Sequence, residues 1–148
     1  LPFDDDAFDV VVLSQTLQAT HRPAFVIDEM MRVGREAVVS FPNFGHLPLR
    51  LGLALRGRMP KSRVLPFEWH DTPNIHLCTI ADFEDLVRRR GLRIARRIAL
   101  APDGSRGGGC SEWRPNRLAA GAVYVLHRAH GGPPAGAGEG APGGSARA

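Results

Sequence analysis

Two short apolar runs on either side of a helical segment form the dominant pattern of the chain. The first run, Val10–Leu13, is apolar at every position and is followed directly by small polar residues; the second spans 36–41. A continuous apolar run is typical of a strand that is covered on both faces, as in a parallel sheet with helices on each side. Residues 8–43 therefore predict a β-α-β unit.

The segment between the two runs predicts one helix. Pro23 suits the first turn of a helix, and Gly34 is placed to end it as a C-terminal cap. Apolar residues recur between them at helical spacing, which predicts a broad buried face. These residues are Val26, Ile27, Met30, Met31 and Val33.

Residues 47–55 carry two conflicting signals. Leucine stands at every second position from 47 to 55, which favours a strand. The composition, leucine with alanine and arginine and without β-branched residues, favours a helix. We predict a helix that Gly57 and Pro60 end. The following segment, 61–76, holds bulky aromatic and histidine side chains, so we expect an ordered loop over the strand ends, where loops are often functional.

The last third of the folded part predicts a helix and two strands. Thr79 and Asp82 have the spacing of a capping box, and the helix they start ends at Gly91. Residues 92–100 and 120–127 are interpreted as strands, with a glycine-rich loop at 107–109 and a turn region at 114–118 between them. This order predicts an antiparallel hairpin added to the parallel sheet.

The charge, the low-complexity end and the cysteine content of the chain indicate its domain organisation and its compartment. The 148 residues carry a formal net charge of +4, nearly all of the positive charge is arginine, and residues 131–148 are almost entirely Gly, Pro, Ala and Ser. We therefore expect one folded part at 1–128 and a disordered tail at 129–148. No apolar run approaches the ~20 residues that span a bilayer, and two cysteines make no disulfide framework, so we expect a cytoplasmic protein without a membrane partner.

Arginine content alone does not indicate nucleic-acid binding. The densest cluster, Arg88–Arg90, falls at the end of a predicted helix, where cations complement the helix dipole. The chain lacks a basic stripe interleaved with aromatic residues. We predict no nucleic-acid partner.

Several blocks resemble known families. Phe8–Gln18 resembles the fourth strand of S-adenosylmethionine-dependent methyltransferases of the seven-strand, Rossmann-like α/β class. More specifically, residues 8–100 resemble the MetW family of methionine biosynthesis proteins, and the blocks at 40–46 and 72–78 are the most specific. The matching blocks are Leu13–Gln18, Arg32–Gly34, Val39–His46, Gly57–Pro60, Leu65–Pro66 and Asp71–Thr79.

The resemblance implies a fold and a pathway. The chain would hold strands four to seven of the methyltransferase fold, in the order 4-5-7-6, with strands one to three and their main cofactor motif outside it. It would then bind S-adenosylmethionine poorly by itself and would expose apolar surface beside its first strand. The family is linked to the homoserine O-acyltransferase MetX as a partner. The alternative is an S-adenosylmethionine-dependent methyltransferase that acts on a small molecule, so enzymatic activity stays open.

Four residues at the end of the first strand are the candidate cofactor-binding residues: Leu13, Ser14, Gln15 and Thr16. Ligands of open α/β sheets bind beyond the carboxyl ends of the strands, and the resemblance places the cofactor pocket there. The alternative is that these polar side chains cap a helix and hold a loop.

Five further residues are candidates for contact with a substrate or a partner: Asn43, His46, Trp69, Asn74 and His76. Asn43 and His46 could equally belong to a tight turn around Gly45. Imidazole is suited to general acid or base catalysis near neutral pH, so His76 could act in that role, but it could also be structural. The spacing of residues 70, 71, 76 and 78 matches no standard zinc pattern, so we predict no metal.

Overall fold

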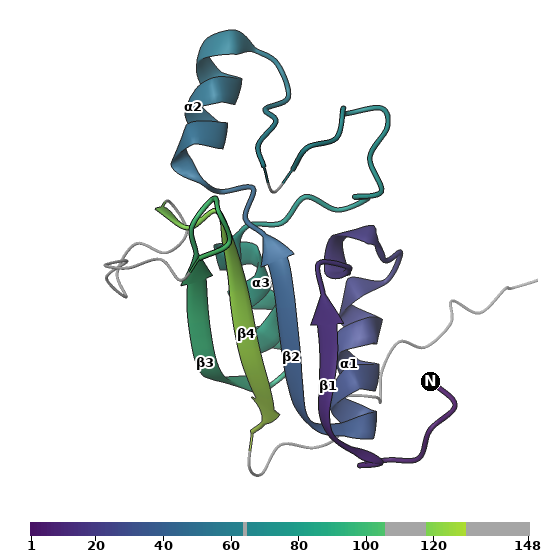
Figure 1. Cartoon of the computed structure of the whole chain (residues 1–148). Coiled ribbons are helices and arrows are strands. Elements are labelled where there is room, and N and C mark those ends of the chain that lie inside the picture. Colours follow the sequence, from purple (N-terminus) through teal and green to yellow (C-terminus); the bar gives the residue numbers. More distant parts are fainter. Residues whose placement is uncertain (64, 106–117, 130–148) are drawn as a thin grey trace, which may run out of the picture.

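The computed structural model describes residues 1–63, 65–105 and 118–129 (Figure 1). The predicted loop at 107–109, nearly all of the turn region at 114–118, and all but the first residue of the predicted tail lie outside this part. In chain order the elements are β1 (Phe8–Ser14), η1 (a 3-10 helix, Leu17–Ala19), α1 (Pro23–Val33), β2 (Gly34–Pro42), α2 (Leu47–Arg56), α3 (Ile80–Arg89), β3 (Leu92–Leu100) and β4 (Gly121–Arg128).

The strands form one mixed sheet in the order β1-β2-β4-β3. β1 and β2 are parallel, and β4 runs antiparallel to both of its neighbours. The last strand in the sequence is therefore inserted between β2 and β3. This is the order that the resemblance implied for four consecutive strands, and the antiparallel pairing of the last two strands confirms the predicted hairpin.

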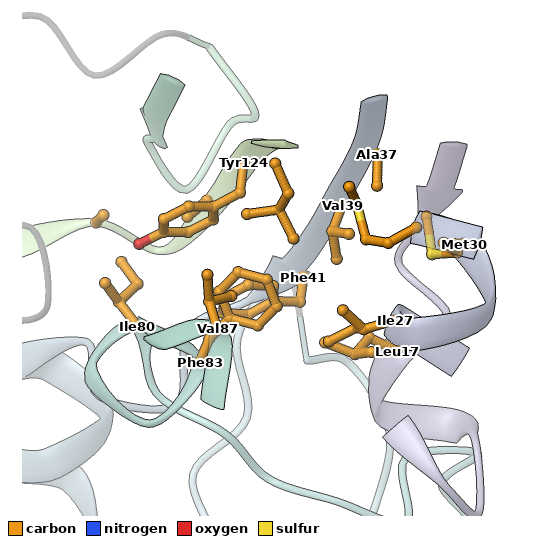
Figure 2. Close-up of a cluster of buried hydrophobic side chains, with 14 residues drawn as sticks. Leu17, Ile27, Met30, Ala37, Val39, Phe41, Ile80, Phe83, Val87 and Tyr124 are labelled. Atoms are coloured by element: carbon orange, nitrogen blue, oxygen red, sulfur yellow. The ribbon is translucent and has the colours of Figure 1, made fainter. Parts of the chain in front are cut away.

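The helices α1 and α3 both cover one face of the sheet, and the core lies between them and the strands (Figure 2). The prediction that β1 is covered on both faces is wrong for the described residues. Val11 and Leu13 pack against the core, whereas Val10 and Val12 on the opposite face are 47% and 64% exposed. The physical reason is that both helices cross the same face.

An aromatic cluster joins the two halves of the core. Tyr124 of β4 stacks on Phe41 of β2, with ring centroids 5.9 Å apart, and Phe83 of α3 packs against both rings. The Tyr124 hydroxyl donates a hydrogen bond to Glu84 Oε1 at 2.6 Å, and Arg97 Nη1 of β3 donates to the same oxygen at 2.6 Å. Burial raises the pKa of Tyr124, so the hydroxyl stays protonated and remains a donor.

Three local predictions are confirmed by the ends of the helices. Residues 47–56 form the helix α2, which ends at Gly57 with a left-handed φ of 61°. Thr79 and Asp82 form the capping box of α3. Arg88 and Arg89 lie in the last turn of α3, as predicted, and Arg90 is its C-cap residue. Arg88 pairs with Asp85 in the same helix, and Arg90 pairs with Asp28 of α1.

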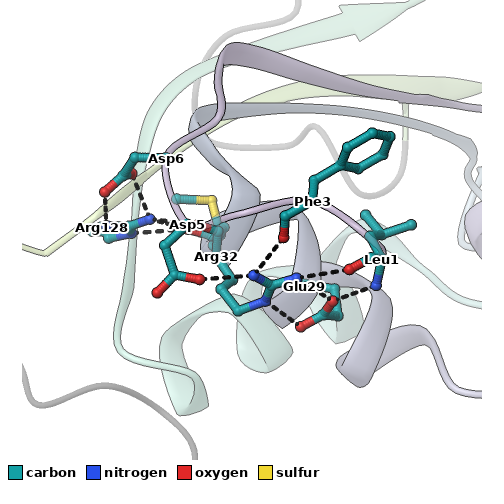
Figure 3. A network of polar contacts seen from close by, with 8 residues as sticks. Leu1, Phe3, Asp5, Asp6, Glu29, Arg32 and Arg128 are labelled. Carbon is teal, nitrogen blue, oxygen red and sulfur yellow. Dashed lines mark hydrogen bonds and ion pairs between the residues drawn. The ribbon is translucent and has the colours of Figure 1, made fainter.

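The residues in front of β1 are held by two arginines (Figure 3). Arg32 at the end of α1 donates to Asp5 Oδ1 at 2.7 Å and to Glu29 Oε1 at 2.8 Å, and this second bond lowers the pKa of Glu29 to about 2. Arg128 of β4 donates to Asp6 Oδ1 at 2.8 Å and to the Met31 carbonyl at 2.8 Å. These contacts fix the position from which β1 enters the sheet.

Gly34 ends α1, as predicted, but not in the conformation of a left-handed cap. Its backbone is extended, and it is the first residue of β2. A Cβ at this position would lie 2.5 Å from Cγ2 of Val11 and 3.1 Å from the Met30 carbonyl oxygen. Glycine is therefore needed here because α1, β1 and β2 approach one another closely.

The Gly34→Ala substitution should lower the free energy of unfolding by about 1–3 kcal/mol, because the added methyl group overpacks this contact. Urea unfolding measures the change. Gly52 is the matched control: it lies within α2, and an added Cβ would meet no atom closer than Pro60 Cβ at 3.7 Å. Gly52→Ala should therefore be neutral or stabilising by up to ~1 kcal/mol.

A double variant tests the cause. If the clash with Val11 accounts for the loss, Val11→Ala should cost less free energy in the Gly34→Ala background than in the original sequence. Simple additivity of the two losses would contradict the assigned contact.

Candidate functional site

The carboxyl ends of the two parallel strands are joined by a pair of serines. Ser14 ends β1 and is in register with Ser40 of β2. Ser40 Oγ donates to Ser14 Oγ at 3.3 Å, and the amide of Gln15 donates to the Ser40 carbonyl at 3.0 Å. Ser14 itself is exposed, so its hydroxyl can still reach a ligand beyond the strand end.

The chain turns sharply after β1. Gln15 has a left-handed φ of 54°, a conformation that costs a non-glycine residue about 1 kcal/mol or more. Thr16 Oγ1 donates to the Ser14 carbonyl at 2.7 Å, which stabilises the turn. The turn leaves Ser14, Gln15 and Thr16 exposed at the same edge, while Leu13 is half-buried in the strand. The four predicted cofactor-binding residues thus lie together.

Gln18 organises the region below this turn. Its side chain is buried, and Nε2 donates to the Pro42 carbonyl at 2.9 Å and to Cys78 Sγ at 3.1 Å. Its backbone carbonyl accepts hydrogen bonds from the amides of Ile75 and His76, at 2.8 and 2.9 Å. One residue therefore connects the end of β2, the start of α3 and the end of the 61–79 segment.

The amide oxygen of Gln18 has a different environment from its amide nitrogen. Gln18 Oε1 is buried and accepts no hydrogen bond from any residue in the part of the chain that the structure describes. A buried acceptor of this kind is available to a water molecule or to a donor group of a ligand. Sequence reasoning did not single out Gln18. The only feature of the sequence that points to Gln18 is its place in the block Leu13–Gln18, which resembles the family.

Asn43 serves the fold rather than an exposed surface. It is completely buried, its Nδ2 donates to the Ala119 carbonyl at 2.8 Å, and its Oδ1 accepts from the amides of Gly45 and Ile80 at 2.9 and 3.2 Å. These bonds hold the turn after β2 against the start of α3. The turn alternative considered for Asn43 therefore has direct structural support.

His46 lies at the N-terminal cap of α2, where its carbonyl accepts the amides of Leu49 and Arg50 at 3.0 and 3.1 Å. Burial lowers the pKa of its imidazole, so the ring is neutral at neutral pH. His76 is exposed and is anchored through its backbone amide. The His46 amide also donates to the Asn43 carbonyl at 3.3 Å, so these two residues share the turn after β2.

Two of the five predicted contact residues, Trp69 and Asn74, do share a site. Both line a shallow hollow of about 140 Å³ beside α2. Apolar side chains form most of its wall, with a few polar groups among them. The other lining residues are Phe44, Met59, Pro60, Lys61, Leu65, Phe67, Glu68, Thr72, Ile75 and Leu77. Figure 1 shows that α2 and the chain between α2 and α3 lie on the side of the sheet where β1 and β2 end, as predicted for the loop.

Cys78 is not an activated thiol. Burial raises its pKa, so the sulfur stays protonated at neutral pH and accepts the hydrogen bond from Gln18. Within the described ranges, no three His, Cys, Asp or Glu side chains are grouped so that they could hold a metal ion. No helix in those ranges is long and apolar enough to cross a membrane.

Comparison with solved structures defines the class of fold. The chain is similar to a protein in complex with the Haloferax volcanii Trm112 methyltransferase activator, with a TM-score of 0.56 and 15% identity over 88% of this chain and 57% of that one. It is also similar to an S-adenosylmethionine-dependent methyltransferase from Thermotoga maritima, with a TM-score of 0.53 and 15% identity over 87% of this chain and 59% of that one. The fold is that of methyltransferases.

Sequence comparison is more specific. The family model of the methionine biosynthesis protein MetW matches residues 2–126, and the chain belongs to this family. It is 41% identical to the bifunctional methionine biosynthesis protein MetXA/MetW of Rhodopirellula baltica over 135 residues. This match covers 85% of the chain. The chain spans only 20% of the length of that relative and under two thirds of both structures.

Gln18→Leu tests the organising role of the buried amide. The variant leaves the Pro42 carbonyl without its donor, so the free energy of unfolding should fall by about 1–3 kcal/mol in urea unfolding. Gln15→Leu is the matched control, because the same change at an exposed side chain should shift stability by about 0.5 kcal/mol or less. Equal effects of the two substitutions would contradict the role assigned to Gln18.

Proposed function

We propose that this protein acts in methionine biosynthesis as a methyltransferase-fold partner of homoserine O-acyltransferase. The observation that carries the proposal is the 41% identity to a relative whose name joins MetXA and MetW in one chain. Two proteins that are joined in one relative often act side by side in another organism as separate chains. We place the complex in the cytoplasm.

We also propose that residues 1–128 form one side of a seven-strand methyltransferase sheet. Two observations support this. Among the described strands β1 is an edge strand, with a hydrogen-bonded neighbour only at β2, and its outer face exposes Val10 and Val12. The open backbone edge of β1 can pair with a further strand, and the apolar face that Val10 and Val12 expose can be covered by further helices. In this arrangement β1, β2, β3 and β4 would be strands four, five, six and seven.

S-adenosylmethionine is the proposed cofactor. Leu13, Ser14, Gln15 and Thr16 would line its pocket at the strand end, where two exposed hydroxyl groups and an amide side chain could contact polar groups of the ligand. The residues that are present fit one wall of such a site. The remainder of the pocket belongs to the proposed strands beside β1, so binding by residues 1–148 alone should be weak.

A second candidate function is methyl transfer to a small molecule. The hollow that Trp69 and Asn74 line favours it, because this apolar site lies on the same side of the sheet as the turn after β1. Gln18 connects the two regions through its bonds to Ile75 and His76. His46 and His76 stay candidates for partner contact at the edge of this region.

Purified acyltransferase from the same organism tests the first function. We expect the full-length protein to co-elute with it on size exclusion and to raise its rate of acyl transfer. Absence of a complex together with an unchanged rate would contradict the proposal. A methyl-transfer assay on candidate acceptors would then become the next experiment.

Gln15→Gly tests the cofactor site without disturbing the fold. Glycine adopts the left-handed turn freely, so stability should be kept, while the loss of the side chain should weaken S-adenosylmethionine binding to the full-length protein by about five- to tenfold. Isothermal titration calorimetry measures the dissociation constant. An unchanged constant with unchanged stability would remove Gln15 from the proposed pocket.

A further inference from the structure

The helix α2 presents an apolar stripe to solvent. Leu47, Leu51 and Leu55 are spaced four residues apart, so they lie on one face of the helix, and they are 40%, 50% and 82% exposed. Leu49, on the opposite face, is 4% exposed and attaches the helix to the rest of the molecule. Figure 1 shows α2 beyond the ends of the strands and away from α1 and α3.

This arrangement is unfavourable for a helix that stays in water. α2 has 10 residues, and isolated helices shorter than ~12–15 residues are marginal in water. Most helical stability in proteins comes from packing of the apolar face, and here that face is open. Contact of the stripe with another apolar surface would both bury the three leucines and stabilise the helix.

The charges around the stripe indicate what kind of surface fits. Arg50, Arg56 and Arg58 are exposed, and none of them makes an ion pair with a described residue. In a dimer of this chain, the arginines of one copy would face the same arginines of the other and repel them, because a two-fold interface brings identical patches together. A partner with carboxylates around an apolar groove would pair with them instead.

We infer that α2 docks its Leu47–Leu51–Leu55 stripe into an apolar groove, edged by acidic residues, on the acyltransferase. The inference rests on the proposed function and assigns the contact surface for it. The mode of recognition is a helix in a groove, in which side chains spaced by one turn are the anchors. The flanking arginines contribute to the rate of association and make it sensitive to salt.

The double variant Leu51→Gln/Leu55→Gln tests the stripe in the full-length protein. Glutamine is a good helix former and adds no charge, so α2 is kept while its apolar face is lost. Calorimetric titration with the acyltransferase should show binding at least tenfold weaker than that of the original protein. The matched control is Phe25→Gln, which removes an exposed apolar side chain from α1 and should leave the affinity unchanged.

Arg50→Glu tests the charges. Stopped-flow or surface-binding kinetics should show slower association and a smaller dependence of that rate on salt. Arg89→Glu is the control, because Arg89 is also exposed but lies at the end of α3. If both variants change the association rate equally, the effect comes from net charge alone, and the assignment of the arginines to the interface is overturned.

The outcomes separate this inference from the function on which it rests. If the original protein does not bind the acyltransferase, the proposed function fails. If it binds and the double variant binds equally well, only the α2 surface is overturned. A lower melting temperature of the double variant in the absence of the acyltransferase would show that the protein itself covers α2. Loss of self-association or of binding to anionic vesicles, with acyltransferase binding unchanged, would assign the stripe to those surfaces.

Discussion

The parallel pairing of β1 with β2 is the constraint on which the rest of the structure depends. It sets Ser14 beside Ser40, so that both strands end at one edge and the turn at Gln15 begins there. It also brings β1 so close to the start of β2 that Gly34 cannot carry a side chain without displacing Val11. The register of two strands thus determines where the helix α1 ends and where a ligand can approach the sheet.

Buried amide side chains complete this arrangement. Gln18 and Asn43 are both almost inaccessible, and both bind backbone atoms from segments that are distant in the sequence. A buried polar group is stabilising only while its partners are present, so these residues hold the segments that follow β2 in defined positions. The apolar core fixes the sheet and its two helices, whereas the amides fix the loops around the strand ends.

Much of the fold could be predicted from periodicity and from turn residues. The apolar runs at 10–13 and 36–41, the capping box at Thr79 and the glycines after the helices each have a local cause that is visible in the sequence. The uncovered face of β1 could not be predicted from its composition, because Val10 and Val12 have the same character as the core residues Val11 and Leu13. Which face a helix covers depends on the path of the whole chain.

The candidate site was less accessible to sequence reasoning. Ser14, Gln15 and Thr16 could be predicted as a group because they follow a strand directly, and the structure places them at one exposed edge. The roles of Gln18 and Asn43 depend on contacts with residues 24 to 76 positions away, for which one sequence holds no signal. The sequence predicts Asn43 as a contact residue with a turn as the alternative, and the structure buries its side chain completely in that turn.

Gln18 holds residues 75–78 against the strand ends through its backbone carbonyl and its side-chain amide. Native-state hydrogen exchange, read at individual amides of the full-length protein, tests it most directly. We expect the amides of Ile75 and His76, which donate to the Gln18 carbonyl, to exchange as slowly as the buried amide of Asn43. His70, whose amide has no acceptor among the described residues, should exchange much faster. Exchange at Ile75 and His76 as fast as at His70 would contradict the anchoring role of Gln18.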